Sequence, residues 1–351
     1  MNYQATWFVL WSVLWAVYFA LDGFDLGAGM LQRFVSRSDE DRRAVINTMG
    51  PVWNGNEVWL LTAGGATFAA FPAVYASMFS FLYTALLLLL FALIFRGVSF
   101  EFRGKRESAA WRGGWDLALQ LGSFVPALLF GVAFGNIFQG LDFGATGWRG
   151  SLPGLLNPYG LLTGILFVLL FAEHGAMWLA VKTAGSGVAE RAARIAGGAW
   201  YALLAVAVAF LIYTNYATSL YDNYRNQLLW GIVPLVAVAA LLGIKLLARA
   251  GRYLWAFYSS ALTILTVVFT GVIGLYPNLI PSSVDPVYNL TIYNSSSSTY
   301  TLRIMTVVAA IFVPIVIIYQ LWMYRIFRPR AAGGEMIQSE EEAFREPSRA
   351  A

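Results

Sequence analysis

Several separate apolar runs of about 20 residues, each long enough to cross a bilayer, dominate this sequence. Only 12% of the residues are charged and 59% are hydrophobic, whereas an average soluble domain has about 25% charged residues. The strands of a membrane β-barrel would instead be short and would alternate polar with apolar residues. The chain is therefore predicted to be an all-α, polytopic membrane protein.

We predict nine spans, with the N-terminus outside and the C-terminus in the cytoplasm, because Lys and Arg accumulate on cytoplasmic loops. In this orientation every Lys and Arg falls inside except Arg149, Arg225 and Arg303. Omitting the second span, the most polar one, would invert every later loop and remove this bias. The predicted spans are 7–31, 50–71, 74–95, 115–138, 157–181, 197–217, 228–248, 255–276 and 303–327.

The spans and their loops predict one membrane domain, residues 1–330, arranged as two four-helix bundles plus one peripheral helix. Residues 331–351 are acidic and rich in Ala, Gly and Glu, so they are predicted to be a disordered cytoplasmic tail. Two longer loops, 139–156 and 277–301, are predicted to lie outside.

The residue types exclude several kinds of site. The chain has no cysteine and one histidine, which excludes disulfides, iron–sulfur clusters, thiolate zinc sites and bis-histidine heme ligation within this chain. The net charge of +4 reflects the cytoplasmic loops, so it does not indicate nucleic-acid binding.

Two aspartates, Asp22 and Asp25, lie within the first predicted span. A carboxylate at that depth costs about 2.5–3.5 kcal/mol on insertion scales, so it usually faces a protein interior or a water-filled path. Their i, i+3 spacing places both on one helix face, which favours a carboxylate relay. The alternative is a hydrated pair at the helix end, or a salt bridge to Arg33 or Arg43.

Gly23 and Gly27, which flank these acids, form a G-x-x-x-G pattern. Small residues at this spacing let a second helix approach closely. We therefore predict tight helix packing beside the two aspartates.

The second predicted span contains Asn54 and Glu57, again spaced i, i+3. Trp53 and Trp59 beside them are typical of interface anchors. Glu57 lies one to two turns inside the helix, so we expect it to face the interior of the bundle rather than lipid.

Glu101 lies between Arg96 and Arg103 at the end of the third predicted span. Arginines at a helix end commonly extend toward the headgroups, and this is the interpretation favoured for both. Glu101 is then predicted to be ion-paired.

Glu173 and His174 lie inside the fifth predicted span, with Met177 on the same face as His174. A lone histidine in a helix interior is most often a hydrogen-bonded packing residue. Heme ligation by His174 and Met177 is a less favoured alternative. A proton-carrying or quinone-contacting Glu173–His174 pair is another.

Six runs in the same order resemble subunit II of the bd-type quinol oxidases, terminal oxidases of bacterial respiratory chains. The resemblance extends over about residues 7–328, with weaker support from 174–176 and 281–283. The matching runs are 22–29, 50–60, 95–103, 122–126, 131–136 and 157–162.

This resemblance implies a multi-pass protein of the bacterial inner membrane with nine helices. It implies a heterodimer with a heme-bearing subunit I, and sometimes a small single-span subunit. In that family heme b, heme d and the quinol site belong to subunit I. Subunit II contributes a hydrophilic cytoplasmic proton path for the reduction of oxygen to water, and a structural quinone within it is possible.

The family usually has an aspartate, a proposed proton-path residue, where this chain has Asn54. An amide cannot ionise, so the hypothesis is that Glu57, one turn further on, takes over as the ionisable station. The predicted proton path comprises Asp25 and Glu57 as carboxylates, Asn54 as a polar contact, and Asp22 and Glu101 as secondary members. No catalytic residue or metal ligand is predicted in this chain.

Two other interpretations remain open from the sequence. The chain could be a stand-alone proton-coupled transporter, although we find no repeat of the kind such proteins often show. It could also be a structural scaffold whose acids are locked in salt bridges.

Overall fold

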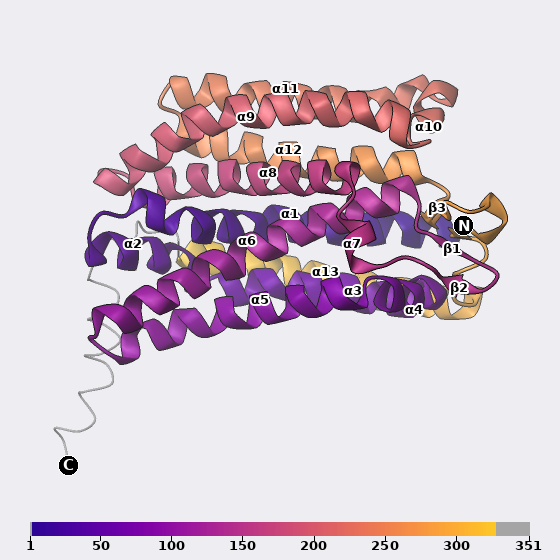
Figure 1. The fold of residues 1–351 in the computed structure, drawn as a ribbon, viewed down its shortest axis with the longest axis horizontal. Helices are drawn as coiled ribbons and strands as arrows, with labels where there is room; N and C mark the ends of the chain where they lie inside the picture. Colours follow the sequence, from indigo (N-terminus) through magenta and orange to yellow (C-terminus); the bar gives the residue numbers. More distant parts are fainter. Residues whose placement is uncertain (1, 328–351) are drawn as a thin grey trace, which may run out of the picture.

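The computed structural model describes residues 2–327, and these form a molecule of long, roughly parallel helices (Figure 1). Within this range eight segments are long and apolar enough to cross a membrane. They contain α1 (Tyr3–Val35), α5 (Tyr83–Phe102), α6 (Ala109–Gln139), α8 (Pro158–Lys182), α9 (Gly187–Ala217), α11 (Ile232–Arg249), α12 (Tyr253–Leu275) and α13 (Thr299–Ile326).

The remaining elements are shorter and lie mainly at the ends of these helices. They are α2 (Asp39–Met49), α3 (Trp53–Ala70), α4 (Pro72–Phe81), α7 (Leu152–Leu155), α10 (Tyr221–Asn226), three 3₁₀ turns (Arg103–Lys105, Leu228–Gly231, Pro286–Tyr288) and the strands β1 (Phe143–Gly144), β2 (Gly147–Trp148), β3 (Asn278–Ile280) and β4 (Leu290–Thr291). The tail predicted at residues 331–351 lies outside the described residues.

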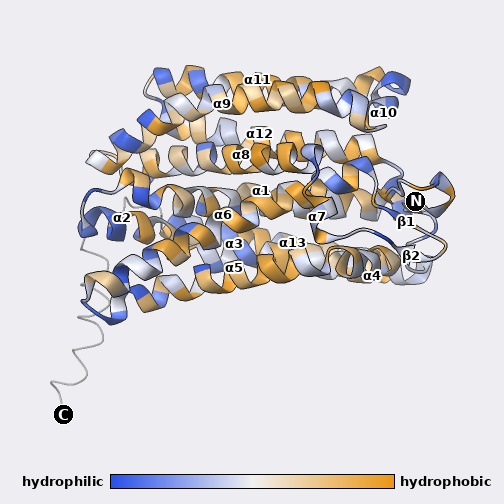
Figure 2. Cartoon of the chain, viewed as in Figure 1, coloured by the Kyte–Doolittle hydropathy of each residue, from blue (hydrophilic) through white to orange (hydrophobic). Residues whose placement is uncertain are grey.

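Helix α1 occupies the centre of the molecule, where it contacts α3, α6, α8, α12 and α13. In Figure 1, α9 and α11 lie on one side of it beyond α8 and α12, and α3, α5 and α13 lie on the other. Hydrophobic residues dominate the middle of the long helices, and hydrophilic residues gather toward both ends (Figure 2). This distribution is expected of a protein that crosses a bilayer.

The second and third predicted spans need correction at their boundary. The second, 50–71, corresponds to α3. The third, 74–95, extends across two helices, because α4 ends at Phe81 and α5 begins at Tyr83. Proline has no backbone N–H and suits the first turn of a helix, so Pro72 starts α4 as a separate helix after α3. Both α4 and α5 are apolar, so hydropathy alone merged them.

Helices α1 and α8 pack closely at the glycines, as the G-x-x-x-G pattern predicted. A methyl group on Gly27 would overlap the carbonyl of Phe171, and one on Gly175 would overlap the backbone of Gly27 and Ala28. A methyl group on Gly23 would lie 2.8 Å from the Phe171 ring. This contact brings the aspartate-bearing turn of α1 against the middle of α8.

The two longer loops meet at one end of the molecule, where each forms a small hairpin, β1–β2 and β3–β4. Gly140 ends α6 with φ of 91°, a conformation that favours glycine. The next residue, Leu141, exchanges backbone hydrogen bonds of 2.9 Å with Pro281 and Ser283 of the other loop. The loops therefore cover the same end of the helices.

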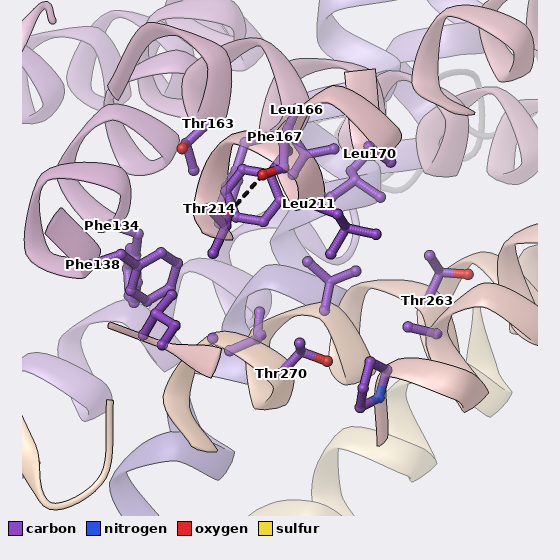
Figure 3. A pocket seen from close by; sticks show the side chains of 18 of the residues that line it. Phe134, Phe138, Thr163, Leu166, Phe167, Leu170, Leu211, Thr214, Thr263 and Thr270 are labelled. Atoms are coloured by element: carbon purple, nitrogen blue, oxygen red, sulfur yellow. Dashed lines mark hydrogen bonds between the residues drawn. The ribbon is translucent and has the colours of Figure 1, made fainter. Parts of the chain in front are cut away.

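A cavity of about 110 Å³ lies among α8, α9, α11 and α12, with residues of α6 and α10 at its edge (Figure 3). Its lining is almost wholly apolar and includes Phe167, Leu170 and Leu241, with threonine side chains such as Thr214 and Thr263 between them. Such a cavity suits an apolar ligand rather than water.

Candidate functional site

Asp22 and Asp25 are both completely buried at the centre of the molecule. They lie on α1, which other helices surround on several sides. Neither aspartate is hydrated at a helix end, and neither pairs with Arg33 or Arg43, so that alternative is wrong in both forms. The two aspartates are buried because other helices surround α1, although both lie near its C-terminal end.

Arg96 of α5 is also fully buried, and it binds Asp22 directly. Its Nη2 donates to Asp22 Oδ1 over 2.9 Å, and Tyr18 donates to Asp22 Oδ2 over 3.1 Å. The interpretation of Arg96 as a residue extending to the headgroups is wrong. Gly122 of α6 explains this: a Cβ there would overlap the backbone of α5 at Arg96, so the two helices pack closely and enclose the arginine.

Glu57 of α3 shares the same guanidinium, since Arg96 Nη1 donates to Glu57 Oε2 over 3.4 Å. The Glu57 side chain is 22% exposed, so it lies at the edge of the buried group. As expected from the sequence, it faces protein on one side. Arg96 therefore bridges two acids that come from different helices.

Asn56, which the sequence analysis did not single out, connects Asp25 to the last helix. Its Nδ2 donates to Asp25 Oδ2 over 2.7 Å. Its Oδ1 accepts from Gln320 Nε2 over 3.0 Å and from the Tyr324 hydroxyl over 2.7 Å. The i, i+4 spacing of Gln320 and Tyr324 within an apolar span is a signal that could have identified them.

Two predicted members lie outside this buried network. Asn54 is exposed at the surface of α3. The buried neighbour of Asp25 on this helix is Asn56. Glu101 is exposed near the end of α5 and forms no ion pair within residues 2–327, so its predicted pairing is wrong.

A second ionic group, which we call the α2-end cluster, lies where α2 meets α1, α5 and α6. Its buried centre is Asp116, which accepts from Arg103 Nε over 2.6 Å and from Gln32 Nε2 over 2.8 Å. Arg42 approaches the same carboxylate at 3.4 Å. Arg103 is thus buried in an ion pair, and its interpretation as a headgroup-facing residue is also wrong.

Asp39 completes the α2-end cluster from the first turn of α2. It pairs with Arg103 at 2.6 Å, with Arg43 at 3.0 Å and with Arg112 at 3.2 Å. Partial burial acts to raise the pKa of Asp39, but the hydrogen bond from Arg103 and the charges of the three arginines outweigh it. The pKa of Asp39 therefore lies below its usual range.

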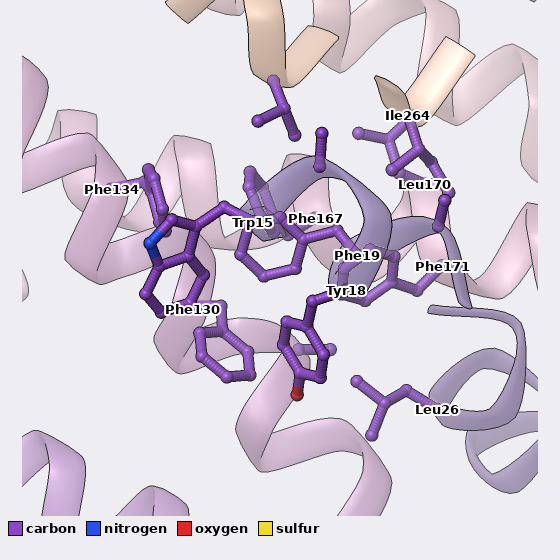
Figure 4. Close-up of a cluster of buried hydrophobic side chains, with 14 of the residues drawn as sticks. Trp15, Tyr18, Phe19, Leu26, Phe130, Phe134, Phe167, Leu170, Phe171 and Ile264 are labelled. Atoms are coloured by element: carbon purple, nitrogen blue, oxygen red, sulfur yellow. The ribbon is translucent and has the colours of Figure 1, made fainter. Parts of the chain in front are cut away.

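An aromatic cluster adjoins the buried network at Tyr18 (Figure 4). The Tyr18 ring packs 5.3 Å from both Phe19 and Phe130, while its hydroxyl reaches Asp22. The cluster comprises Trp15, Tyr18, Phe19, Phe130, Phe134, Phe167 and Phe171. On the other side of the acids along α1, the next buried polar residue is Gln32, which binds the α2-end cluster.

His174 is a packing residue with both ring nitrogens in use. A carbonyl oxygen can only accept, so Nε2 donates to Ala20 over 3.0 Å, and Nδ1 is hydrogen-bonded to the Ser260 hydroxyl over 2.6 Å. The ring stacks on Phe257 at 4.5 Å. The only histidine of the chain therefore has no nitrogen free for an iron ion, and this chain does not fit a heme held by histidine.

Glu173 is buried, and its Oε2 has no hydrogen-bond partner among the described residues. It lies one turn beyond Leu170, which lines the cavity of the outer helices. It is therefore separate from the network around Arg96.

Comparisons with known proteins agree with this fold. The family model for cytochrome bd terminal oxidase subunit II matches residues 3–327. Subunit 2 of the cytochrome bd-I ubiquinol oxidase of Escherichia coli strain K12 is 39% identical, over 92% of this chain and 93% of the relative. Subunit 2 of the cytochrome bd ubiquinol oxidase of Bacillus subtilis strain 168 is 35% identical, over 94% and 97%.

The fold is also similar to a chain of the bd oxidase structure from Geobacillus thermodenitrificans, with a TM-score of 0.76 at 19% identity. The match covers 93% of this chain and 99% of that chain. The resemblance found in the sequence is thus confirmed, and the chain belongs to the cytochrome bd terminal oxidase subunit II family.

Proposed function

We propose that this chain supplies a cytoplasmic proton path to the heme-bearing subunit I of a quinol oxidase and stabilises that partner. The complex would oxidise quinol and reduce oxygen to water with protons taken from the cytoplasm. Family membership places the chain in a respiratory oxidase of the bacterial inner membrane, which argues against the alternative of a stand-alone transporter.

The observation that carries the proposal is the charge balance around Arg96. Asp22 and Glu57 both bind this one guanidinium, and Asp25 lies one turn from Asp22 on the same helix. One cation cannot neutralise three neighbouring carboxylates, two of them fully buried, so the group is suited to hold at least one proton. Asp25 Oδ1 is buried without a partner among the described residues, which makes Asp25 the first candidate to carry it.

Each predicted path residue then has a place in the proposal. Asp25 and Glu57 are the proton-carrying stations, and Asp22 is the ion-pair partner that fixes Arg96. Asn54, exposed one turn before Glu57, is a polar contact for water between this chain and its partner. Glu101, exposed at the end of α5, is a group that collects protons.

The membrane arrangement is part of the same proposal. Helix α3, between α1 and α5 in sequence, is the ninth span beside the eight apolar ones. Helices α1, α3, α5 and α6 form one bundle, α8, α9, α11 and α12 the other, and α13 is peripheral. The N-terminus lies outside, so the α2-end cluster faces the cytoplasm and protons enter from that side.

The hemes would be held by subunit I, because the single histidine here is engaged on both nitrogens. The family name implies a subunit I partner; a small single-span subunit, quinol and lipid are further proposed partners. Heme b and heme d would supply electron transfer and oxygen chemistry in that partner.

The cavity among α8, α9, α11 and α12 is the proposed place for a structural quinone, since its apolar lining suits an isoprenoid tail. Narrowing it with Thr263→Phe should reduce the quinone extracted from the purified complex. Unchanged quinone content in a folded variant would contradict this placement.

The central experiment is Glu57→Gln in the intact oxidase complex. Turnover should fall by about tenfold or more, since a positioned proton carrier contributes about 10²–10⁴ in rate. Quinol-driven oxygen consumption and proton uptake from the inside are measured together in proteoliposomes, per mole of heme.

Glu190→Gln is the matched control, because Glu190 is exposed at the start of α9 and forms no ion pair within residues 2–327. It should leave both rates unchanged. Normal turnover with normal proton uptake in Glu57→Gln would reject the path. Reduced stability with normal turnover would support the scaffold interpretation instead.

A further inference from the structure

Helix α13 contacts the rest of the chain through apolar residues near its start, such as the buried Leu302, and through polar side chains near its end. None of the residues in its most apolar 18-residue stretch is buried. Two of its inward-facing residues, Gln320 and Tyr324, nevertheless converge on one atom, the Oδ1 of Asn56. This convergence sets the orientation of the Asn56 amide.

An amide oxygen has two acceptor positions, and both positions on Asn56 are occupied by donors from α13. The amide nitrogen must therefore point the other way, where it donates to Asp25 Oδ2 over 2.7 Å. Reversing the amide would place its oxygen against a carboxylate oxygen and its N–H groups against the two α13 donors. The contacts to α13 thus favour one orientation of Asn56.

This orientation distinguishes the two oxygens of Asp25. Oδ2 is held as an acceptor by Asn56, whereas Oδ1 is buried with no partner among the described residues. A proton bound to Asp25 would sit on Oδ1, because a proton on Oδ2 would meet the N–H of Asn56. The side of Asp25 from which a proton can leave therefore depends on residues of α13, which bind Asn56, which in turn binds Asp25.

We infer that Tyr324 and Gln320 are positioning residues, which orient Asn56 and thereby place the proton of Asp25 on Oδ1. This inference rests on the proposed role of Asp25 in the proton path. Tyr324 and Gln320 touch neither Asp25 nor the proton. They act through the Asn56 amide alone.

The test uses Tyr324→Phe and Gln320→Met in the intact complex, each of which removes one donor and keeps most of the side-chain volume. Tyr319→Phe is the matched control, since Tyr319 lies on the exposed side of the same helix. Infrared difference spectra report the carbonyl stretch of protonated Asp25, which is assigned by its loss in Asp25→Asn. Oxygen consumption is recorded as a function of pH, with heme content as the check on assembly.

In Tyr324→Phe and Gln320→Met the Asp25 band should move to higher wavenumber, because a hydrogen bond to the carbonyl oxygen lowers that stretch. Turnover should fall by about tenfold, the size of one lost hydrogen bond to a reacting group, and the pH profile should shift. Tyr319→Phe should change none of these. An unmoved band and an unmoved pH profile in both fully hemylated variants would overturn the inference.

The two proposals can fail separately. If Asp25→Asn retains full turnover and proton uptake, the proton path is wrong, yet a shifted Asp25 band in the α13 variants would still establish the positioning. If Tyr324→Phe does not assemble, Gln320→Met decides the question alone, because that variant leaves Tyr324 unchanged.

Discussion

Among residues 2–327, Arg96 is the one cation paired with Asp22 and Glu57. It donates to Asp22 and to Glu57 and is itself completely buried. Removing one partner of a buried ion pair leaves a charge without compensation, whereas removing both partners together is much less harmful. Single and double substitutions can therefore separate the contribution of Arg96 to stability from a role in turnover.

We expect Arg96→Met to destabilise the protein by about 3–5 kcal/mol, as for other broken buried ion pairs. Adding Asp22→Asn removes the stranded acid, so the double variant should be more stable than Arg96→Met alone. The melting temperature of the purified complex measures both. A double variant that melts below the single variant would show that Arg96 and Asp22 do not compensate each other.

At this scale the sequence predicted which acids are buried but not what they bind. Helical spacing placed Asp22 and Asp25 on one face, and the hydropathy of the span indicated their depth. Their partners Asn56 and Arg96 lie 31 and 74 residues away in sequence, and Tyr324, which binds Asn56, lies a further 268 residues along the chain. No local pattern encodes such contacts. Asn54 was chosen because the family resemblance has a path aspartate at that position. That Asn56 faces α1 instead depends on the rotation of α3 against α1, which is a tertiary property.

Helix α2 connects the ends of longer helices through ion pairs. Asp39 binds Arg103 and Arg112, and Asp41 binds Arg191 of α9 at 2.6 Å. Ser38 caps the helix by accepting from the backbone of Asp41. One short helix thereby connects three long ones through charge.

The ion pairs of Asp39 in α2 should weaken in acid. The pKa of Asp39 is lowered in the folded protein, so its contribution to stability is present at neutral pH. It is lost from about pH 5 downward, as Asp39 takes up a proton. Asp39→Asn should remove up to about 1 kcal/mol at pH 7 and flatten the fall of melting temperature below about pH 5. Glu40→Gln, at an exposed neighbour without an ion pair in residues 2–327, should retain the full slope.

Boundaries between elements were predictable only where residue types change. Loop charge and length located most spans to within a few residues, and Pro158 marks the start of α8 as expected of proline. The break at Leu82 follows no such signal, since apolar residues continue through it. There the chain turns because α4 and α5 pack against different neighbours, which hydropathy does not record.

At the scale of the whole molecule, helix α3 presents polar groups at the surface. Glu57 is 22% exposed there, and Asn54 is exposed. Polar groups at membrane depth need a protein or water partner. A partner subunit on this side would provide that cover, and this agrees with the proposed heterodimer.

Deleting this chain should therefore abolish assembly of the heme-bearing partner, because both proteins would expose a surface that lipid cannot satisfy. Membranes from the deletion strain should lack the heme d absorption band, and the partner should be degraded. A fully hemylated, active partner in the absence of this chain would contradict the proposed stabilising role.

The burial of α1 has a consequence for how the protein is made. Synthesis starts at the N-terminus, so Asp22 reaches the membrane before Arg96, which lies 74 residues later. Each unpartnered carboxylate costs about 2.5–3.5 kcal/mol in a helix that crosses alone. The apolar residues of α1 offset this cost, and Asp22 gains its counter-ion only once α5 has been synthesised and packed beside α1.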